Sequence, residues 1–180
     1  GENRYHFGGR CNKYANLRKK ITIDENETID WTEIRRKMYF EKFAPAPGTL
    51  VKRTDKTVGI PETFGVHTLY PLYSTFFHEL GVETRLVSDF NEKDMARCES
   101  SFCFPAEAAH GMMGALLRTD ADFYFLPHFK RMESLEKDVH ACTCPFTQGQ
   151  PYYLRTAFGV DDAKILRPVL AVPRSDFDSI

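Results

Sequence analysis

Cysteines are the residues of this sequence whose chemistry is easiest to recognise. The 180-residue chain contains five of them: Cys11, Cys98, Cys103, Cys142 and Cys144. An odd number, with one pair separated by a single residue, does not fit an ordinary disulfide framework, and the first ten residues contain no apolar signal-peptide core. We therefore interpret the cysteines as thiols in a reducing, cytoplasmic compartment. A single cysteine is by default a small buried apolar residue, but the set favours metal or cluster binding.

Two of the cysteines stand close to prolines and precede predicted helices. Cys144 is followed by Pro145, and Cys103 by Phe104 and Pro105. A proline beside a ligand cysteine keeps the backbone from continuing as regular structure. The free N–H groups at the start of a helix favour a thiolate and a negatively charged cluster. Because thiolates are soft ligands, this pattern indicates an iron–sulfur cluster, although the chain has no tight ferredoxin-type run of cysteines.

The elements that must position these cysteines alternate between short apolar runs and amphipathic segments. Strands are expected at 57–60, 82–87, 122–126 and 165–172, and helices at 30–43, 68–80, 105–117 and 150–158, with a helical turn at 92–97. The strands are short continuous apolar runs, as expected for strands buried on both faces. This order predicts an α/β fold, a Rossmann-like, doubly wound parallel sheet with helices on its faces.

The chain is expected to have two parts. Residues 1–55 are predicted to form an irregular N-terminal segment with one helix. A linker that is rich in proline and glycine is expected at 44–48. Residues 56–180 are predicted to form the Rossmann-like domain, which we expect to be a fragment of a larger protein. In such a sheet, ligands bind beyond the carboxyl ends of the strands. We expect four segments at that edge: 61–65, 100–105, 127–130 and 142–146. Cys103 and Cys144 should therefore lie near each other.

Composition excludes several classes of function. The chain has 24 Lys and Arg residues against 25 Asp and Glu residues, so it carries no basic surface for nucleic acid or an anionic membrane. No apolar run approaches the roughly 20 residues that span a bilayer. A glycine-rich phosphate loop is also missing from the sequence, so any ATP hydrolysis by the parent protein is expected elsewhere.

The sequence resembles the C-terminal domain of unknown function in large acyl-CoA dehydratase activase-related proteins, also called CoA-substrate-specific enzyme activases. The residues that carry this resemblance follow one another in the family's order: Gly9-Arg10-Cys11, Val58-Gly59-Ile60-Pro61, Leu69-Tyr70-Pro71-Leu72-Tyr73, Cys103-Phe104-Pro105-Ala106 with His110-Gly111, and Cys144-Pro145-Phe146 with Gln148-Gly149-Gln150-Pro151-Tyr152. The domain is also similar to subunits of 2-hydroxyacyl-CoA dehydratases and benzoyl-CoA reductases.

The resemblance implies a cofactor and a role. By that likeness, Cys11, Cys103 and Cys144 would be the ligands of a [4Fe–4S] cluster, leaving one iron open or held by a non-cysteine ligand. The domain would serve ATP-driven, low-potential electron transfer to acyl-CoA-type chemistry in anaerobic-type systems. Its partners would be ATPase domains of the same parent protein or a dehydratase or reductase. Cys98 and Cys142 match no family position, so we expect them to be spare or buried thiols.

Other functions stay open at this point. Cys142, Cys144, His128 and His140 could form a structural zinc site, although the Cys-x-Cys spacing is shorter than usual. Alternatively, the domain could be a metal-free interaction module. For the remaining candidates we expect ordinary roles: helix packing for His110, core packing for Tyr152 and Tyr153, and capping or solvation for the carboxylates Glu62 and Glu107.

Overall fold

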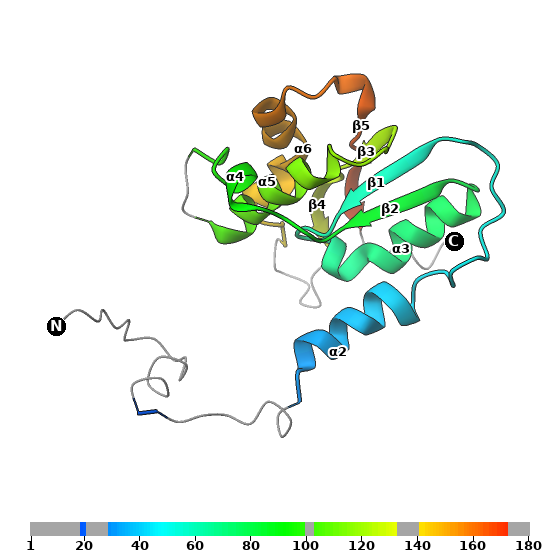
Figure 1. Cartoon of the computed structure of the whole chain (residues 1–180), viewed down its shortest axis with the longest axis horizontal. Coiled ribbons are helices and arrows are strands. Elements are labelled where there is room, and N and C mark those ends of the chain that lie inside the picture. The colour runs from blue at the N-terminus through cyan, green and yellow to red at the C-terminus, as the bar shows by residue number, and fades with distance from the viewer. Residues whose placement is uncertain (1–18, 21–28, 100–102, 133–140, 173–180) are drawn as a thin grey trace. The chain divides into compact units, whose positions relative to one another are not determined.

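The computed structural model describes residues 19–20, 29–99, 103–132 and 141–172 (Figure 1). The chain divides into two units, Gly1–Arg35 and Arg36–Ile180. The boundary falls within helix α2 (Trp31–Lys37), which continues as the π-helical turn η1 (Met38–Lys42) and so accounts for the expected helix at 30–43. None of the helices in the described ranges is both long enough and apolar enough to cross a membrane.

A four-stranded parallel sheet forms the centre of the second unit. Its strands are β1 (Thr57–Pro61), β2 (Glu83–Val87), β3 (Phe123–Phe125) and β5 (Ile165–Leu166), in the order β2-β1-β3-β5. The chain therefore runs outward in opposite directions from β1, which is the arrangement of a doubly wound sheet. The predicted fold class is confirmed, and the switch point lies between β1 and β3.

Two strands extend past this sheet in a way that the sequence analysis got wrong. The expected strand at 122–126 does end before Pro127, as β3, but the sequence analysis missed the strand that follows the proline, β4 (His128–Met132). The expected strand at 165–172 is divided into β5 and β6 (Val169–Val172). β4 and β6 pair in parallel in the register of β3 and β5, which places Pro127 opposite Pro168. We call this junction between the two strand pairs the proline seam. The amides of Leu126 and His128 donate hydrogen bonds to the opposite strand across it, at 2.9 Å each. The prolines add no such bond, because a proline has no N–H.

The helices lie on the two faces of the sheet (Figure 1). α3 (Val66–Glu79) covers one face through Val66, Tyr73 and Phe77, which pack against β1 and β3. On the other face lie α5 (Phe104–Leu116) and α6 (Pro145–Phe158), which share a core containing Met113, Leu116 and Leu154. Two shorter helices complete the described chain: α4 (Glu92–Met95) and the 3₁₀ turn η2 (Asp162–Lys164).

Helix α6 starts five residues before the expected helix at 150–158. Pro145 occupies its first turn, where the missing N–H costs nothing, and the helix then passes through Pro151 without ending. The pattern of the sequence was misread because Pro151 normally argues against a helix interior. Gly159, at φ 62°, ends the helix in the left-handed conformation that glycine favours.

Small residues let α5 approach its neighbours closely. A Cβ atom at Gly59 of β1 would lie 2.4 Å from Leu116 Cδ1, so α5 packs directly onto the central strand. On the opposite side of α5, a Cβ atom at Gly114 would lie 2.2 Å from Asp94 Cγ, and one at Gly111 would lie 2.7 Å from Phe90 Cβ. α5 is therefore enclosed between the sheet and the α4 segment.

Candidate functional site

The two cysteines predicted to bind a cluster occupy equivalent places in the fold. Cys103 is the N-cap residue of α5 and Cys144 is the N-cap residue of α6, and neither side chain caps its helix with a hydrogen bond. Each helix has a proline in its first two positions. Because both helices return from the carboxyl edge of the sheet, both thiols stand at helix N-termini on that side. Cys103 is half-buried and Cys144 is exposed.

The loop that carries Cys144 is fixed by the β4 extension. Thr143 donates its backbone N–H to the Lys130 carbonyl at 3.0 Å, and its hydroxyl donates to the Phe129 carbonyl. Gln148, one turn into α6, donates from its side chain to the Thr143 carbonyl at 2.8 Å. The position of Cys144 thus depends on strand residues beyond Pro127.

A buried polar contact joins α6 to the carboxyl end of β1. The side-chain amide of Gln150 donates to the hydroxyl of Thr63, and both residues are almost fully buried. Thr63 is the second residue after the end of β1, and Phe64 next to it adopts a positive φ of 44°, which is uncommon for a residue other than glycine. This contact ties the start of α6 to the switch point of the sheet.

Tyr153 lies in α6 and has a buried hydroxyl. The hydroxyl oxygen has no hydrogen-bond partner in the described part of the chain. Burial raises the pKa of Tyr153, and negative charge on the thiols of Cys98, Cys103 and Cys144 raises it further. The sequence analysis had set Cys98 aside and had treated Tyr153 only as a packing residue.

Aromatic contacts hold the Tyr153 ring in place. It stacks on His110, with ring centroids 5.3 Å apart and planes inclined by 16°, and it meets the edge of Phe146 at 6.4 Å. His110 is buried, and its Nδ1 lies 2.7 Å from the Ala106 carbonyl within α5. His110 therefore packs in the helix as expected. One face of α6 carries Phe146, Gly149 or Gln150, and Tyr153, which are spaced three or four residues apart. This helical spacing can be recognised in the sequence only if the helix is taken to start at Pro145.

A cavity of about 850 Å³ opens beside Tyr153. Its walls come from the segment after α4, from α5 and from α6, and they include Cys98, Ala106, His110, Phe146 and Thr156. Arg97 also reaches it, with its guanidinium 4.8 Å from the centre of the Phe158 ring. A mostly apolar cavity with a thiol and a hydroxyl is suited to exclude water from a group held nearby.

The described residues do not complete a metal site on their own. Among residues 29–99, 103–132 and 141–172, no three His, Cys, Asp or Glu side chains form a group that could hold a metal ion. Cys11, the third predicted cluster ligand, lies outside the described residues. Cys142 is exposed. The predicted ligand set is therefore neither assembled nor excluded.

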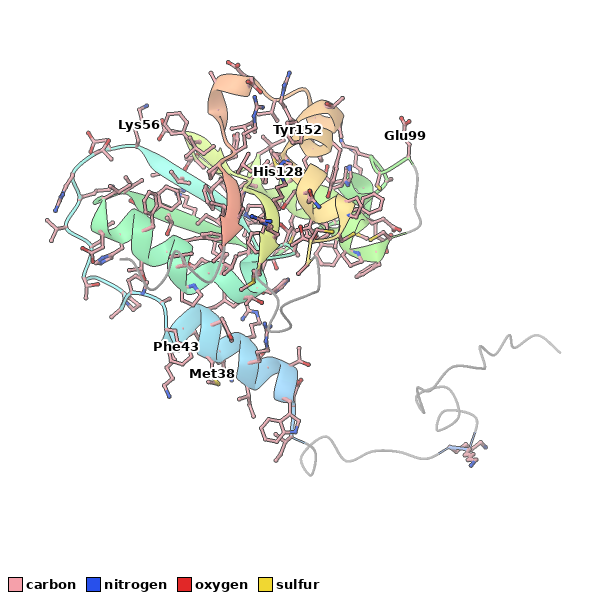
Figure 2. All side chains as sticks on the ribbon, turned by 180° about the vertical axis from the view of Figure 1, so that it is seen from behind. Met38, Phe43, Lys56, Glu99, His128 and Tyr152 are labelled. Atoms are coloured by element: carbon pink, nitrogen blue, oxygen red, sulfur yellow. The ribbon has the colours of Figure 1, made fainter. Side chains whose placement is uncertain are left out.

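The residues of the alternative zinc site are only partly described. His128, in β4, has a buried Nδ1 without a hydrogen-bond partner in the described chain, and its ring meets the edge of Tyr152 at 5.8 Å (Figure 2). His140 lies outside the described residues. The described members thus include one buried imidazole nitrogen and two exposed thiols, Cys142 and Cys144.

Glu62 has a structural role that differs from the expected solvation or helix capping. Its carboxylate, at the carboxyl end of β1, is 5% exposed and accepts two hydrogen bonds from the Arg36 guanidinium, each 3.1 Å long. His67 Nδ1 lies 3.6 Å from the same carboxylate. A paired, buried carboxylate of this kind fixes Arg36, near the end of α2, to the edge of the sheet.

One family model matches the chain over residues 57–178, and its description is the CoA enzyme activase uncharacterised domain. This range includes every strand of the sheet and both N-cap cysteines. The chain belongs to this family. No curated protein and no solved structure matches it.

Proposed function

We propose that this domain holds a [4Fe–4S] cluster through Cys11, Cys103 and Cys144 and takes part in the electron transfer of a CoA enzyme activase. The observation that supports the proposal is the placement of two cysteines. Cys103 and Cys144 are each the N-cap residue of a helix with a proline in its first two positions. When bound, such a cluster supplies one-electron transfer at low potential.

The chain's own residues would prepare the site in three ways. The N-termini of α5 and α6 stabilise negative charge on Cys103 and Cys144, because their first N–H groups have no partner within the helix. Neither cysteine uses its side chain to cap its helix, so both sulfur atoms stay available. The mostly apolar walls beside Tyr153 would lower the local dielectric constant.

The proposed partners follow from the family. ATPase domains of the same parent protein, or a dehydratase or reductase of acyl-CoA substrates, would deliver or receive the electron. This chain would contribute the site for the cluster, and ATP hydrolysis would take place in the partner.

Metal analysis of the chain prepared without oxygen tests this function. We expect about four iron and four sulfide per chain, as the cluster type requires. Cys103→Ser, Cys144→Ser and Cys11→Ser should each abolish stoichiometric iron. Cys142→Ser is the matched control, because this exposed thiol lies two residues from Cys144 and should be dispensable. Stoichiometric zinc without iron or sulfide would overturn the proposal in favour of a structural zinc site.

A further inference from the structure

We infer that the cavity formed by α5, α6 and the segment after α4 binds a small, uncharged aromatic molecule. In this site Nε2 of His110 accepts a hydrogen bond from a hydroxyl or N–H group of the ligand. The inference goes beyond the proposed function, because the ligand would bind to this cavity whether or not a cluster is present.

The first argument is the hydrogen bond that orients the His110 ring. His110, in α5, is 5% exposed, and its Nδ1 lies 2.7 Å from the Ala106 carbonyl oxygen. A carbonyl oxygen can only accept a hydrogen bond, so Nδ1 donates and carries a hydrogen atom. In the neutral imidazole the lone pair is then on the other ring nitrogen, Nε2, which becomes an acceptor.

The second argument is that this acceptor is unused. Nε2 of His110 has no hydrogen-bond partner in the described part of the chain, and it is not fully buried. Because His110 belongs to the wall of the cavity, Nε2 is the ring atom that the cavity reaches. Polar groups inside proteins are usually hydrogen-bonded, so we expect a donor at this nitrogen.

The ring of His110 is held in place before any ligand arrives. It stacks on Tyr153, with ring centroids 5.3 Å apart, and the ring of Phe158 lies 6.4 Å away. The contact of Nδ1 with the Ala106 carbonyl fixes its remaining rotation. An acceptor that is already fixed loses little conformational freedom on binding, which favours affinity.

The other polar side chains of the wall give the site little preference for an ion. Thr156 donates its hydroxyl to the Tyr152 carbonyl at 2.9 Å, and the Arg97 guanidinium donates to the Ala157 carbonyl at 3.2 Å. The two charged residues of the wall, Arg97 and Glu99, have opposite signs. Their charges balance, so the wall favours an uncharged ligand.

The size and the apolar surface of the cavity indicate an aromatic ligand. A volume of about 850 Å³ is typical of sites for small molecules, and the walls are mostly apolar. The rings of Phe146 and Tyr152 belong to these walls. Aromatic molecules bury a large apolar surface against such rings, and a single polar group then fixes their orientation.

The experiment uses two probes that share one ring system, 2-naphthol and 2-methoxynaphthalene. Only 2-naphthol has a hydroxyl that can donate. The full chain, labelled with nitrogen-15 at histidine, is titrated with each probe at about pH 8, where histidines are normally neutral. We expect 2-naphthol to bind and to shift the Nε2 resonance of His110. We expect 2-methoxynaphthalene to bind roughly 3- to 10-fold more weakly, as for the loss of one neutral hydrogen bond.

Two variants assign this preference to a residue. His110→Phe keeps a ring beside Tyr153 but removes the acceptor, so it should bind both probes equally. His78→Phe is the matched control, because His78 lies in α3 on the other face of the sheet, with its Nε2 3.0 Å from the Thr49 hydroxyl. It should keep the wild-type preference. Circular dichroism verifies that each variant is folded.

Three results would overturn the inference. They are a wild-type chain that binds neither probe, a wild-type chain that binds both equally or without a shift of the His110 Nε2 resonance, and a His110→Phe chain that still prefers 2-naphthol. The first two need no variant, so they decide the matter even if His110→Phe does not fold. Iron analysis is a separate measurement, so a failure of the cluster proposal is distinguishable from a failure here.

Discussion

Helices α5 and α6 begin in the same way but differ in how deeply they are buried. Each starts from an N-cap cysteine with a proline in its first two positions. Nine of the 13 residues of α5 are buried, whereas only Gln150, Pro151 and Leu154 are buried among the 14 of α6. The local sequence therefore determines where each helix starts and where its cysteine lies. The position of the helix relative to the sheet determines how much of the helix is buried.

The reason for this difference lies in the connections. α5 links β2 to β3 and so crosses the central strand β1, and the α4 segment covers its other side. α6 packs against β4 and α5, contributes Leu154 to the core, and is also fixed by polar contacts, including those of Thr143 and Gln150. The site thus combines a rigid helix start at Cys103 with a more adaptable one at Cys144.

Gly114→Ala should have the largest effect on this comparison. The added methyl group would collide with Asp94, which is held by Asn91 and Arg118 and cannot easily move aside. We expect a loss of about 3 kcal/mol in the free energy of unfolding, at the upper end for overpacking. Urea denaturation measures this change.

Gly149→Ala in α6 is the matched control. Its nearest neighbour would be Tyr153 Cδ1 at 3.5 Å, an ordinary contact distance. Because alanine is the better helix former, we expect a gain of about 0.5–1 kcal/mol. Equal losses in the two variants would contradict the conclusion that α5 is packed more tightly than α6.

Asp94→Asn should have the second largest effect. Arg118 donates to the Asp94 carboxylate at 2.7 Å, and this hydrogen bond holds the pKa of Asp94 below its usual range. Replacing the carboxylate should cost about 2 kcal/mol at neutral pH, as for other hydrogen bonds to charged groups. Unfolding by urea at several pH values measures this cost.

The pH dependence has a defined sign. Folding lowers the pKa of Asp94, so its carboxylate contributes its full stabilisation above about pH 4, the ordinary pKa of an aspartate. This stabilisation is lost as the pH falls through the pKa of Asp94 in the folded protein. The stabilities of wild type and Asp94→Asn should therefore converge in acid. Asp162→Asn near the end of α6 removes an exposed partner of Arg155 and Arg167 and should change stability less.

Thr63→Val should have the smallest of these effects. It removes the acceptor of the buried Gln150 amide without changing the volume of the side chain greatly. We expect a loss of about 1 kcal/mol, measured by thermal or urea unfolding. Thr156→Val, on the exposed side of α6, should change stability by less than about 0.5 kcal/mol. An equal effect of the two variants would show that the link from α6 to β1 is unimportant.

The sequence was sufficient to predict the parallel sheet and most of its helices. Short apolar runs with glycine or proline at their ends marked β1, β2 and β3, and the wide apolar face of α3 marked its helix. That Cys103 and Cys144 precede helices could also be predicted, although the N-cap position of Cys144 could not, because α6 was expected to start at residue 150. These features are local, so one segment of sequence contains enough information to predict them.

The rest of the site depends on contacts between distant segments. Tyr153 gains its surroundings only when α6 lies against α5 and the chain after α4, which no local pattern reports. Likewise, the pairing of Glu62 with Arg36 spans 26 residues and turns an apparently solvated carboxylate into a buried anchor. The start of α6 was misjudged for a local reason, since Pro151 is an exception to a rule that usually holds.

The proline seam between the two parallel ladders has a consequence for local opening. Across Pro127 and Pro168 the β3–β5 and β4–β6 pairs are joined by the amides of Leu126 and His128, with no donor from either proline. The β4–β6 ribbon can therefore open as its own cooperative unit while the central sheet stays closed, and its amides exchange with solvent sooner than those of β1. Because Thr143 is bonded to β4, each such opening frees the loop that carries Cys144. The time for which the Cys144 thiol stays in place is therefore set by the opening of β4 and β6, and not by the unfolding of the whole domain.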